Sequence, residues 1–123
     1  MKYLNRAIGS FCEDICCNYL KNNKYKILDR NFRNRLGELD IICLDNRTIV
    51  IIEVKGRFSL NYGTPLEAVN YNKRNIIIKL TKYYLYKKQI SDMNIRFDII
   101  EVYLNNKKSK YTINHIKDAF RLY

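Results

Sequence analysis

The fold of this chain is decided by residues 37–57, GELDIICLDNRTIVIIEVKGR, which hold two apolar runs around a short polar segment. The runs at 37–44 and 48–55 are rich in Ile, Val and Leu, and the residues DNR between them are typical of a turn. The pattern predicts two strands joined as a hairpin. Charges inside such runs are costly to bury unless they are paired or bind a metal. The stretch nevertheless contains four of them: Glu38, Asp40, Glu53 and Lys55.

Side chains alternate across a strand, and this alternation is expected to bring the four charges to one end of one face. Glu38 and Asp40 then share a face with Ile42 and Leu44. Two hairpin registers remain open. A two-residue loop sets Glu38 opposite Glu53, whereas a four-residue loop sets Asp40 opposite Glu53. In either register the charges gather at the open end of the hairpin, where cross-strand Cβ atoms lie about 4.5–5.5 Å apart.

Two interpretations account for these paired charges. Carboxylates as close as Asp40 and Glu53 repel each other unless a proton or a cation lies between them. Hard oxygen ligands of this kind suit Mg²⁺ or Mn²⁺. The other interpretation is a salt-bridged sheet end, in which Lys55 neutralises Glu53 and Glu38 is solvated.

The rest of the chain predicts one α/β domain over residues 1–123. The capping box TPLE opens the second helix, and HIKDAF suggests a final helical turn. The order α-β-β-β-α-β-β predicts a central mixed sheet flanked by helices, with a three-strand meander followed by a helical crossover. The predicted elements are a helix at 3–22, strands at 25–32, 37–44 and 48–55, a helix from 64 to about 88, strands at 95–104 and 111–114, and the turn at 115–120.

Composition limits the kinds of partner, cellular location and metal site that we expect for this protein. The formal net charge is +11, which favours a polyanionic partner, although an AT-rich host genome would also enrich lysine. No apolar run approaches the length of a membrane span, and the N-terminus lacks the features of a signal peptide. The four cysteines form no CxxC pair, so we expect small buried hydrophobes in a reducing cytoplasm rather than a zinc site.

An Asp followed by a strand carrying Glu-x-Lys resembles the PD-(D/E)xK nuclease superfamily, which has the restriction-endonuclease-like fold. The chain more specifically resembles the YraN family of predicted endonuclease-related bacterial proteins, and the matching motifs run nearly end to end. These motifs are Gly9 with Glu13, Asn31, GELD at 37–40, EVKGR at 53–57, YGTPLEAV at 62–69 with Lys73, RFDII at 96–100 and HIKDAF at 115–120.

The resemblance implies a role for each charged residue. Asp40 and Glu53 would be the metal ligands, and Lys55 would position the attacking water or stabilise the phosphate. Glu13 would add a catalytic carboxylate from the first helix; without the resemblance, solvent is its expected surrounding. The same motifs supply two supporting residues, Gly37 and Glu38.

Four cations could contact nucleic acid. Lys73 falls in the middle of the apolar face of the long helix, where it either snorkels to solvent or aims its ammonium at a phosphate or a site carboxylate. The other three, on loops flanking the charged motif, either bind phosphates or are ordinary solvated charges. They are Arg33, Arg35 and Arg57.

The sequence therefore predicts a Mg²⁺- or Mn²⁺-dependent nuclease that hydrolyses phosphodiester bonds in DNA, with branched or processing intermediates among its candidate substrates. The alternative is a non-catalytic nucleic-acid-binding module of a DNA-processing complex. We expect a cytoplasmic protein with no membrane association. The sequence leaves the oligomeric state open, a homodimer included.

Overall fold

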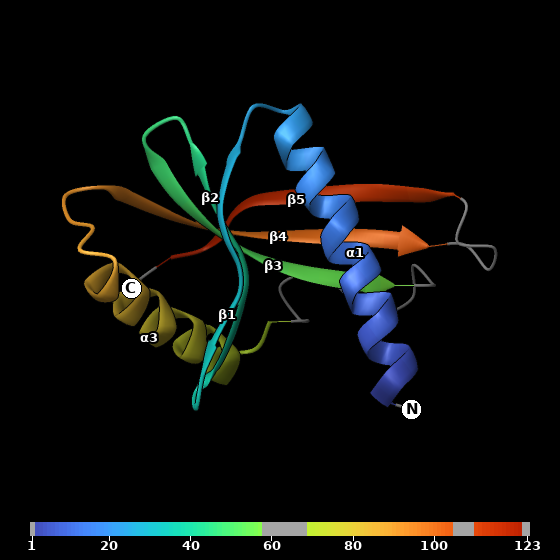
Figure 1. The fold of residues 1–123 in the computed structure, drawn as a ribbon, viewed down its shortest axis with the longest axis horizontal. Coiled ribbons are helices and arrows are strands. Elements are labelled where there is room, and N and C mark those ends of the chain that lie inside the picture. Colours follow the sequence, from blue (N-terminus) through green and yellow to red (C-terminus); the bar gives the residue numbers. More distant parts are fainter. Residues whose placement is uncertain (1, 58–68, 105–109, 122–123) are drawn as a thin grey trace.

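The computed structural model describes residues 2–57, 69–104 and 110–121 (Figure 1). Within these ranges the element order is α-β-β-β-α-β-β, which confirms the predicted mixed α/β fold and the order expected of the restriction-endonuclease-like fold. The elements are α1 (Lys2–Asn22), β1 (Lys26–Asn34), β2 (Gly37–Asp45), β3 (Thr48–Arg57), α3 (Tyr71–Lys87), β4 (Asn94–Leu104) and β5 (Tyr111–Phe120). No helix in the described ranges is long and apolar enough to cross a membrane.

The five strands form one mixed sheet in the order β1-β2-β3-β4-β5. Only the β3–β4 pair is parallel within the described ranges, and α3 lies in the chain between these two strands. The predicted meander and helical crossover are therefore both present. Figure 1 shows α1 running across β3 and β4, with α3 beside β1.

Alternating side chains of the sheet belong to two apolar clusters, one on each face of the sheet. Val50 and Ile52 of β3 pack with α1, whereas Ile49 and Ile51 of the same strand pack with α3. The sheet is thus covered on both faces, which explains why its central strands are almost wholly apolar. All four cysteines are buried, as expected of small hydrophobes: Cys12, Cys16, Cys17 and Cys43.

The hairpin of β2 and β3 adopts the register predicted for a four-residue loop. Leu44 pairs with Ile49, and one further pair, Asp45 with Thr48, tightens the turn to two residues. In the other direction the ladder ends at Ile41 and Ile52. Beyond that pair β2 and β3 are no longer hydrogen-bonded neighbours, so the sheet opens at the charged end of the hairpin.

The helical turn predicted at 115–120 is wrong, because these residues belong to β5. Long-range packing overrides the local pattern there. Phe120 stacks on Phe97 of β4 with ring centroids 4.9 Å apart, and Ile116 pairs with Ile99. Asp118 adopts a positive φ of 55°, and the register between the strands shifts beside it. The apparent helical periodicity is therefore a bulged edge strand.

A single helix from residue 64 to about 88 is also wrong. Helix α3 begins at Tyr71, and its N-cap Asn70 is extended, with φ −71° and ψ 174°. The Asn70 side chain accepts a hydrogen bond from the Lys73 N–H at 2.9 Å, which satisfies one of the free donors of the first turn. The predicted capping box at 64–67, most of the motif at 62–69 and the turn at 105–109 lie outside the described residues.

Asp98 ties β4 to β5 through a buried set of hydrogen bonds. Arg96 donates to both of its oxygens at 2.9 Å, and the backbone N–H of Asp118 donates at the same distance. Nε2 of His115 lies 2.7 Å from the carboxylate. Burial alone would raise the pKa of Asp98, but the hydrogen bonds from His115 and Arg96 outweigh burial and hold that pKa below its ordinary value.

We therefore predict that Asp98→Ala lowers the unfolding free energy by about 3–5 kcal/mol, the cost of leaving buried partners without their counter-charge. Urea unfolding measures this loss. Asp14→Ala is the matched control, because the Asp14 side chain is 59% exposed and pairs with Arg30, which is itself partly exposed. That control should cost no more than about 1 kcal/mol. Equal losses in both variants would contradict the structural role of Asp98.

Candidate active site

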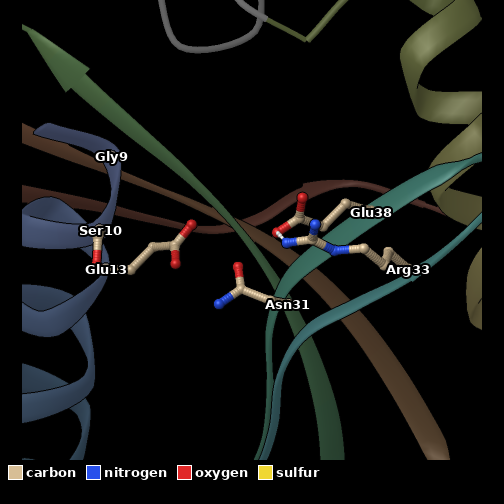
Figure 2. Close-up of a pocket in the computed structure, with 6 residues that line it drawn as sticks. All are labelled: Gly9, Ser10, Glu13, Asn31, Arg33 and Glu38. Carbon is tan, nitrogen blue, oxygen red and sulfur yellow. Dashed lines mark ion pairs between the residues drawn. The ribbon is translucent and has the colours of Figure 1, made fainter. Parts of the chain in front are cut away.

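Three carboxylates meet where the sheet opens. Ligand oxygens of Glu13 from α1 and of Glu38 and Asp40 from β2 all lie within 4.8 Å of one another. We call these residues the acidic cluster. Glu38 and Glu13 also line a cavity of about 450 Å³, and Figure 2 shows Glu13 reaching from the helix toward Asn31 and Glu38 on the strands.

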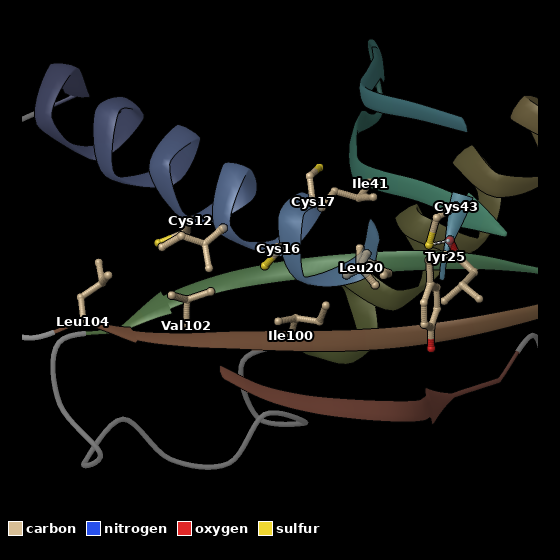
Figure 3. Packing of buried hydrophobic residues seen from close by; sticks show 13 residues of the cluster. Cys12, Cys16, Cys17, Leu20, Tyr25, Ile41, Cys43, Ile100, Val102 and Leu104 are labelled. Carbon is tan, nitrogen blue, oxygen red and sulfur yellow. Dashed lines mark hydrogen bonds between the residues drawn. The ribbon is translucent and has the colours of Figure 1, made fainter. Parts of the chain in front are cut away.

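Close contact between helix and sheet brings Glu13 to this position. The preceding residue, Cys12, is fully buried in the cluster drawn in Figure 3. A Cβ on Gly56 of β3 would lie only 2.7 Å from the Cys12 sulfur, so the helix can approach β3 only because residue 56 has no side chain. The packing contact between Cys12 and Gly56 therefore determines the position of Glu13, whose side chain is 15% exposed.

A break in strand alternation brings Glu38 and Asp40 to Glu13. The sequence predicted that these two share a face with Ile42, on the side of the sheet that packs with α3. Instead Leu39 packs there with Ile42, whereas Ile41 packs with α1. The alternation thus breaks between Asp40 and Ile41, at the end of the hydrogen-bonded ladder. The carboxylates of Glu38 and Asp40 consequently lie with the one on α1.

Asp40 occupies the point where the ladder ends. Its Oδ2 accepts a hydrogen bond from the Val54 backbone N–H at 2.9 Å. Burial raises the pKa of Asp40 to about 7, and the charge of Glu53 adds to the rise. The Val54 N–H opposes this shift but does not cancel it. At neutral pH a proton or another cation is therefore favoured at Asp40.

Glu53 has a different environment. It is buried, and its Oε1 lies 2.7 Å from Nζ of Lys73 and 3.4 Å from Nζ of Lys55. Burial, together with the neighbouring Lys73, lowers the pKa of Lys55. Burial would also lower the pKa of Lys73, but the charge of Glu53 outweighs it and that pKa is raised. Two cations thus share one carboxylate. In the neighbouring acidic cluster, Glu13 lies 3.7 Å from the Arg30 guanidinium and Glu38 lies 3.6 Å from the Arg33 guanidinium.

The three arginines predicted to bind phosphate have different surroundings. Arg33 is the penultimate residue of β1, 68% exposed, with its guanidinium 3.6 Å from Glu38. Arg35 is exposed in the turn between β1 and β2. Arg57 is not on a loop: it ends β3, its side chain is 9% exposed, and its Nε lies 2.6 Å from the fully buried Glu101. Only Arg33 and Arg35 of the three therefore face solvent.

No site role was predicted for Asn31, although it was one of the matching motif positions. Asn31 lines the cavity and has a positive φ of 53° in the middle of β1, a conformation that Asn tolerates better than most residues. Burial raises the pKa of Glu13, and a hydrogen bond from the Asn31 side chain partly opposes the rise. An isolated Asn inside a strand-like sequence was the signal available for this residue.

Comparison with known proteins identifies close relatives. The chain matches the model of the uncharacterised protein family UPF0102 over residues 12–102. A UPF0102 protein of Clostridium botulinum (strain Alaska E43 / Type E3) is 54% identical over 121 residues, which cover 98% of this chain and 99% of that protein. A UPF0102 protein of Clostridium beijerinckii is 53% identical over 122 residues, with 99% of each chain covered.

The environment of Asp40 predicts a pH-dependent stability in metal-free protein. Because the folded protein raises the pKa of Asp40 from 3.8 to about 7, the carboxyl stays protonated in the folded chain after it has ionised in the unfolded chain. Its contribution to stability is therefore fully present at low pH and is lost as the pH rises through that interval. Asn at position 40 carries no charge and keeps an oxygen acceptor for the Val54 N–H.

Asp40→Asn should accordingly raise the Tm at about pH 8 with a chelator present, and the gain should shrink toward about pH 4. Thermal unfolding at the two pH values measures the difference. Asp14→Asn removes an exposed carboxylate from α1 and serves as the control. A gain for Asp40→Asn that does not depend on pH would contradict the raised pKa.

Proposed function

This chain belongs to the UPF0102 family, the YraN family that its motifs resemble, and on that premise we propose that it is a metal-dependent endonuclease-like enzyme that hydrolyses phosphodiester bonds in DNA. One observation carries the proposal. Three carboxylates lie within 4.8 Å of one another, beside a buried glutamate that is flanked by two lysines. A metal-dependent phosphodiesterase needs both features, because it must bind a hard cation and an anionic substrate side by side.

The residues present fit a divalent cation. Glu13, Glu38 and Asp40 offer only oxygen donors, which are the ligands that Mg²⁺ and Mn²⁺ prefer. The raised pKa of Asp40 also supports a cation site, since a site that favours a proton between carboxylates also favours a cation there. We propose these three residues as the metal holders, with Glu53 beside them. When bound, the cation would polarise the phosphate and lower the pKa of its water.

The two lysines supply the complementary charge. Lys55 and Lys73 both contact Glu53, and their side chains remain 25% and 40% exposed. An entering phosphate can therefore meet their ammonium groups without a rearrangement of the strands. Fixed cations of this kind offset the negative charge that develops on phosphorus oxygens in the transition state. The net charge of +11 attracts the polyanionic substrate at longer range.

A non-catalytic nucleic-acid-binding module is the second candidate. The observation that favours it is the compensation of Glu53, which two lysines neutralise without any need for a metal. The two candidates differ in one measurable respect, because only the enzyme requires a cation at the acidic cluster. Calorimetric titration with Mn²⁺, combined with a cleavage assay, therefore separates them.

We predict that Mn²⁺ binds wild-type protein, that Asp40→Ala abolishes this binding, and that Glu53→Gln abolishes cleavage. Lys55→Ala should lower the cleavage rate by roughly 10²- to 10³-fold, by analogy with the loss of one oxyanion donor. Plasmid nicking and cleavage of flapped and four-way DNA measure the activity. Glu53→Gln keeps the side-chain size, and circular dichroism checks the fold. Wild-type protein that binds Mn²⁺ but cleaves none of these substrates would favour the binding module. Asp40→Ala that binds Mn²⁺ as wild type does would exclude the acidic cluster as the site.

Affinity for DNA should also fall steeply with salt. Each phosphate contact made by Lys or Arg contributes a slope of about −0.9 in a plot of log affinity against log salt concentration. Fluorescence anisotropy over a salt series measures the slope. Arg33→Gln should make it shallower by about one unit, whereas the matched change Arg57→Gln concerns a buried ion pair and should leave it unchanged in folded protein. A flat slope for wild type would attribute the positive charge to composition alone.

A further inference from the structure

A second cavity lies at the tip of the β1–β2 hairpin, apart from the one beside the acidic cluster. Its volume is about 600 Å³, within the usual range of ligand pockets. Asn34, Arg35 and Leu36 line it from the turn, and Tyr83 lines it from α3. Leu36 is 52% exposed and Tyr83 is 44% exposed, so both present apolar surface to solvent.

The walls of this cavity are held in place. The Leu36 backbone N–H donates to the Asn34 side chain at 2.8 Å, which orders the turn. The Tyr83 ring lies against Phe32 of β1, with ring centroids 6.1 Å apart and planes inclined by 37°. A Cβ on Gly37 would lie 3.1 Å from Ile76, so the hairpin tip rests directly on α3. An aromatic ring and an aliphatic side chain are therefore set together in the wall of the cavity, each with part of its surface exposed.

Positive charge surrounds the apolar walls. Arg35 is exposed in the turn itself. Lys79 and Lys87 are exposed on α3, one turn before and one turn after Tyr83, at the i,i+4 spacing that places side chains on one face of a helix. An aromatic ring between cations is the arrangement that binds single-stranded nucleic acid, in which bases stack and phosphates are neutralised.

The cavity shares the β1–β2 hairpin with the candidate active site, with the acidic cluster toward α1 and Tyr83 on α3. Arg33 approaches Glu38 of the acidic cluster, and the next residue in the chain, Asn34, already lines the second cavity. A nucleic-acid strand whose phosphate lies at the acidic cluster would therefore pass around the tip of this hairpin to reach Tyr83.

We propose that this second cavity is a nucleobase subsite, which takes one unstacked base of the DNA strand that is presented to the acidic cluster. Tyr83 and Leu36 contact the face of the base, and Arg35 neutralises a neighbouring phosphate. This inference rests on the proposed function and specifies its substrate class. A base inside an intact duplex is stacked on both sides and cannot enter, so the subsite selects single-stranded, flapped or branched DNA over continuous duplex.

The test compares two labelled single-stranded oligonucleotides in metal-free buffer, one with all its bases and one with a run of abasic sites. Both carry the same phosphates, so they differ only in what the subsite contacts. Wild type should prefer the base-containing strand, and Tyr83→Ala should reduce that preference by roughly 5- to 150-fold, the range for loss of one base–aromatic stack. Tyr83→Phe should keep the preference, because the ring remains.

Tyr86→Ala is the matched control, since Tyr86 is 83% exposed on the same helix and does not line the cavity. It should leave the preference unchanged. Because Tyr83 contacts Phe32, thermal unfolding checks its variants, and Leu36→Ala in the exposed turn provides a second variant expected to weaken the preference in the same direction.

The possible outcomes distinguish a failure of the subsite from a failure of the proposed nucleic-acid function. Equal wild-type affinity for both strands, or equal losses in Tyr83→Ala and Tyr86→Ala, overturns the subsite and leaves the proposed nuclease untouched. A preference that neither Tyr83→Ala nor Leu36→Ala alters also overturns it. Failure of wild type to bind either strand at low salt removes the proposed nucleic-acid function, and the subsite with it.

Discussion

The candidate site depends on one hydrogen bond, from the backbone N–H of Val54 to the carboxylate of Asp40. Buried N–H groups must find an acceptor, and in a regular ladder the neighbouring strand supplies it. Here the ladder between β2 and β3 ends at Ile41 and Ile52, and a side chain serves instead. The sheet can therefore open without leaving this donor unsatisfied. Asp40 is at once the residue that permits the opening and the most perturbed carboxylate within it.

The opening separates a group of carboxylates from a carboxylate that is held by lysines. In a continuous sheet these two groups of charges would lie side by side. Toward α1, three carboxylates are crowded together and burial raises the pKa of two of them, Glu13 and Asp40. Toward α3, Glu53 is held between two ammonium groups. The first half holds three carboxylates against the guanidinium groups of Arg30 and Arg33, and the second half has lysines with exposed surface. A cation on one side and a phosphate on the other would satisfy both halves at once.

Short-range periodicity was enough to predict the element order and the covered faces of β3, since apolar alternation fixes which side chains face a core. It also located the charged hairpin end. The burial of the cysteines was predicted from their spacing, which contains no CxxC pair. Periodicity failed where contacts with residues far away in the sequence determine the local structure. Residues 115–120 form a strand because Phe97 and Asp98 of β4 hold Phe120, His115 and Asp118. Likewise, the position of Asp40 could not be predicted, because strict alternation assumes a ladder that continues.

The contact between Gly56 and Cys12 sets the thickness of the layer between α1 and the sheet, and Glu13 follows Cys12 directly in the chain. A single added carbon at residue 56 would have to displace either a fully buried sulfur or the helix that carries it. Evolution can therefore change these two positions only together: a homologue with a side chain at 56 should carry glycine or alanine at 12. The packing distance between α1 and the sheet is thus set by two uncharged residues, Cys12 and Gly56, that are direct neighbours in the chain of Glu13 and Lys55.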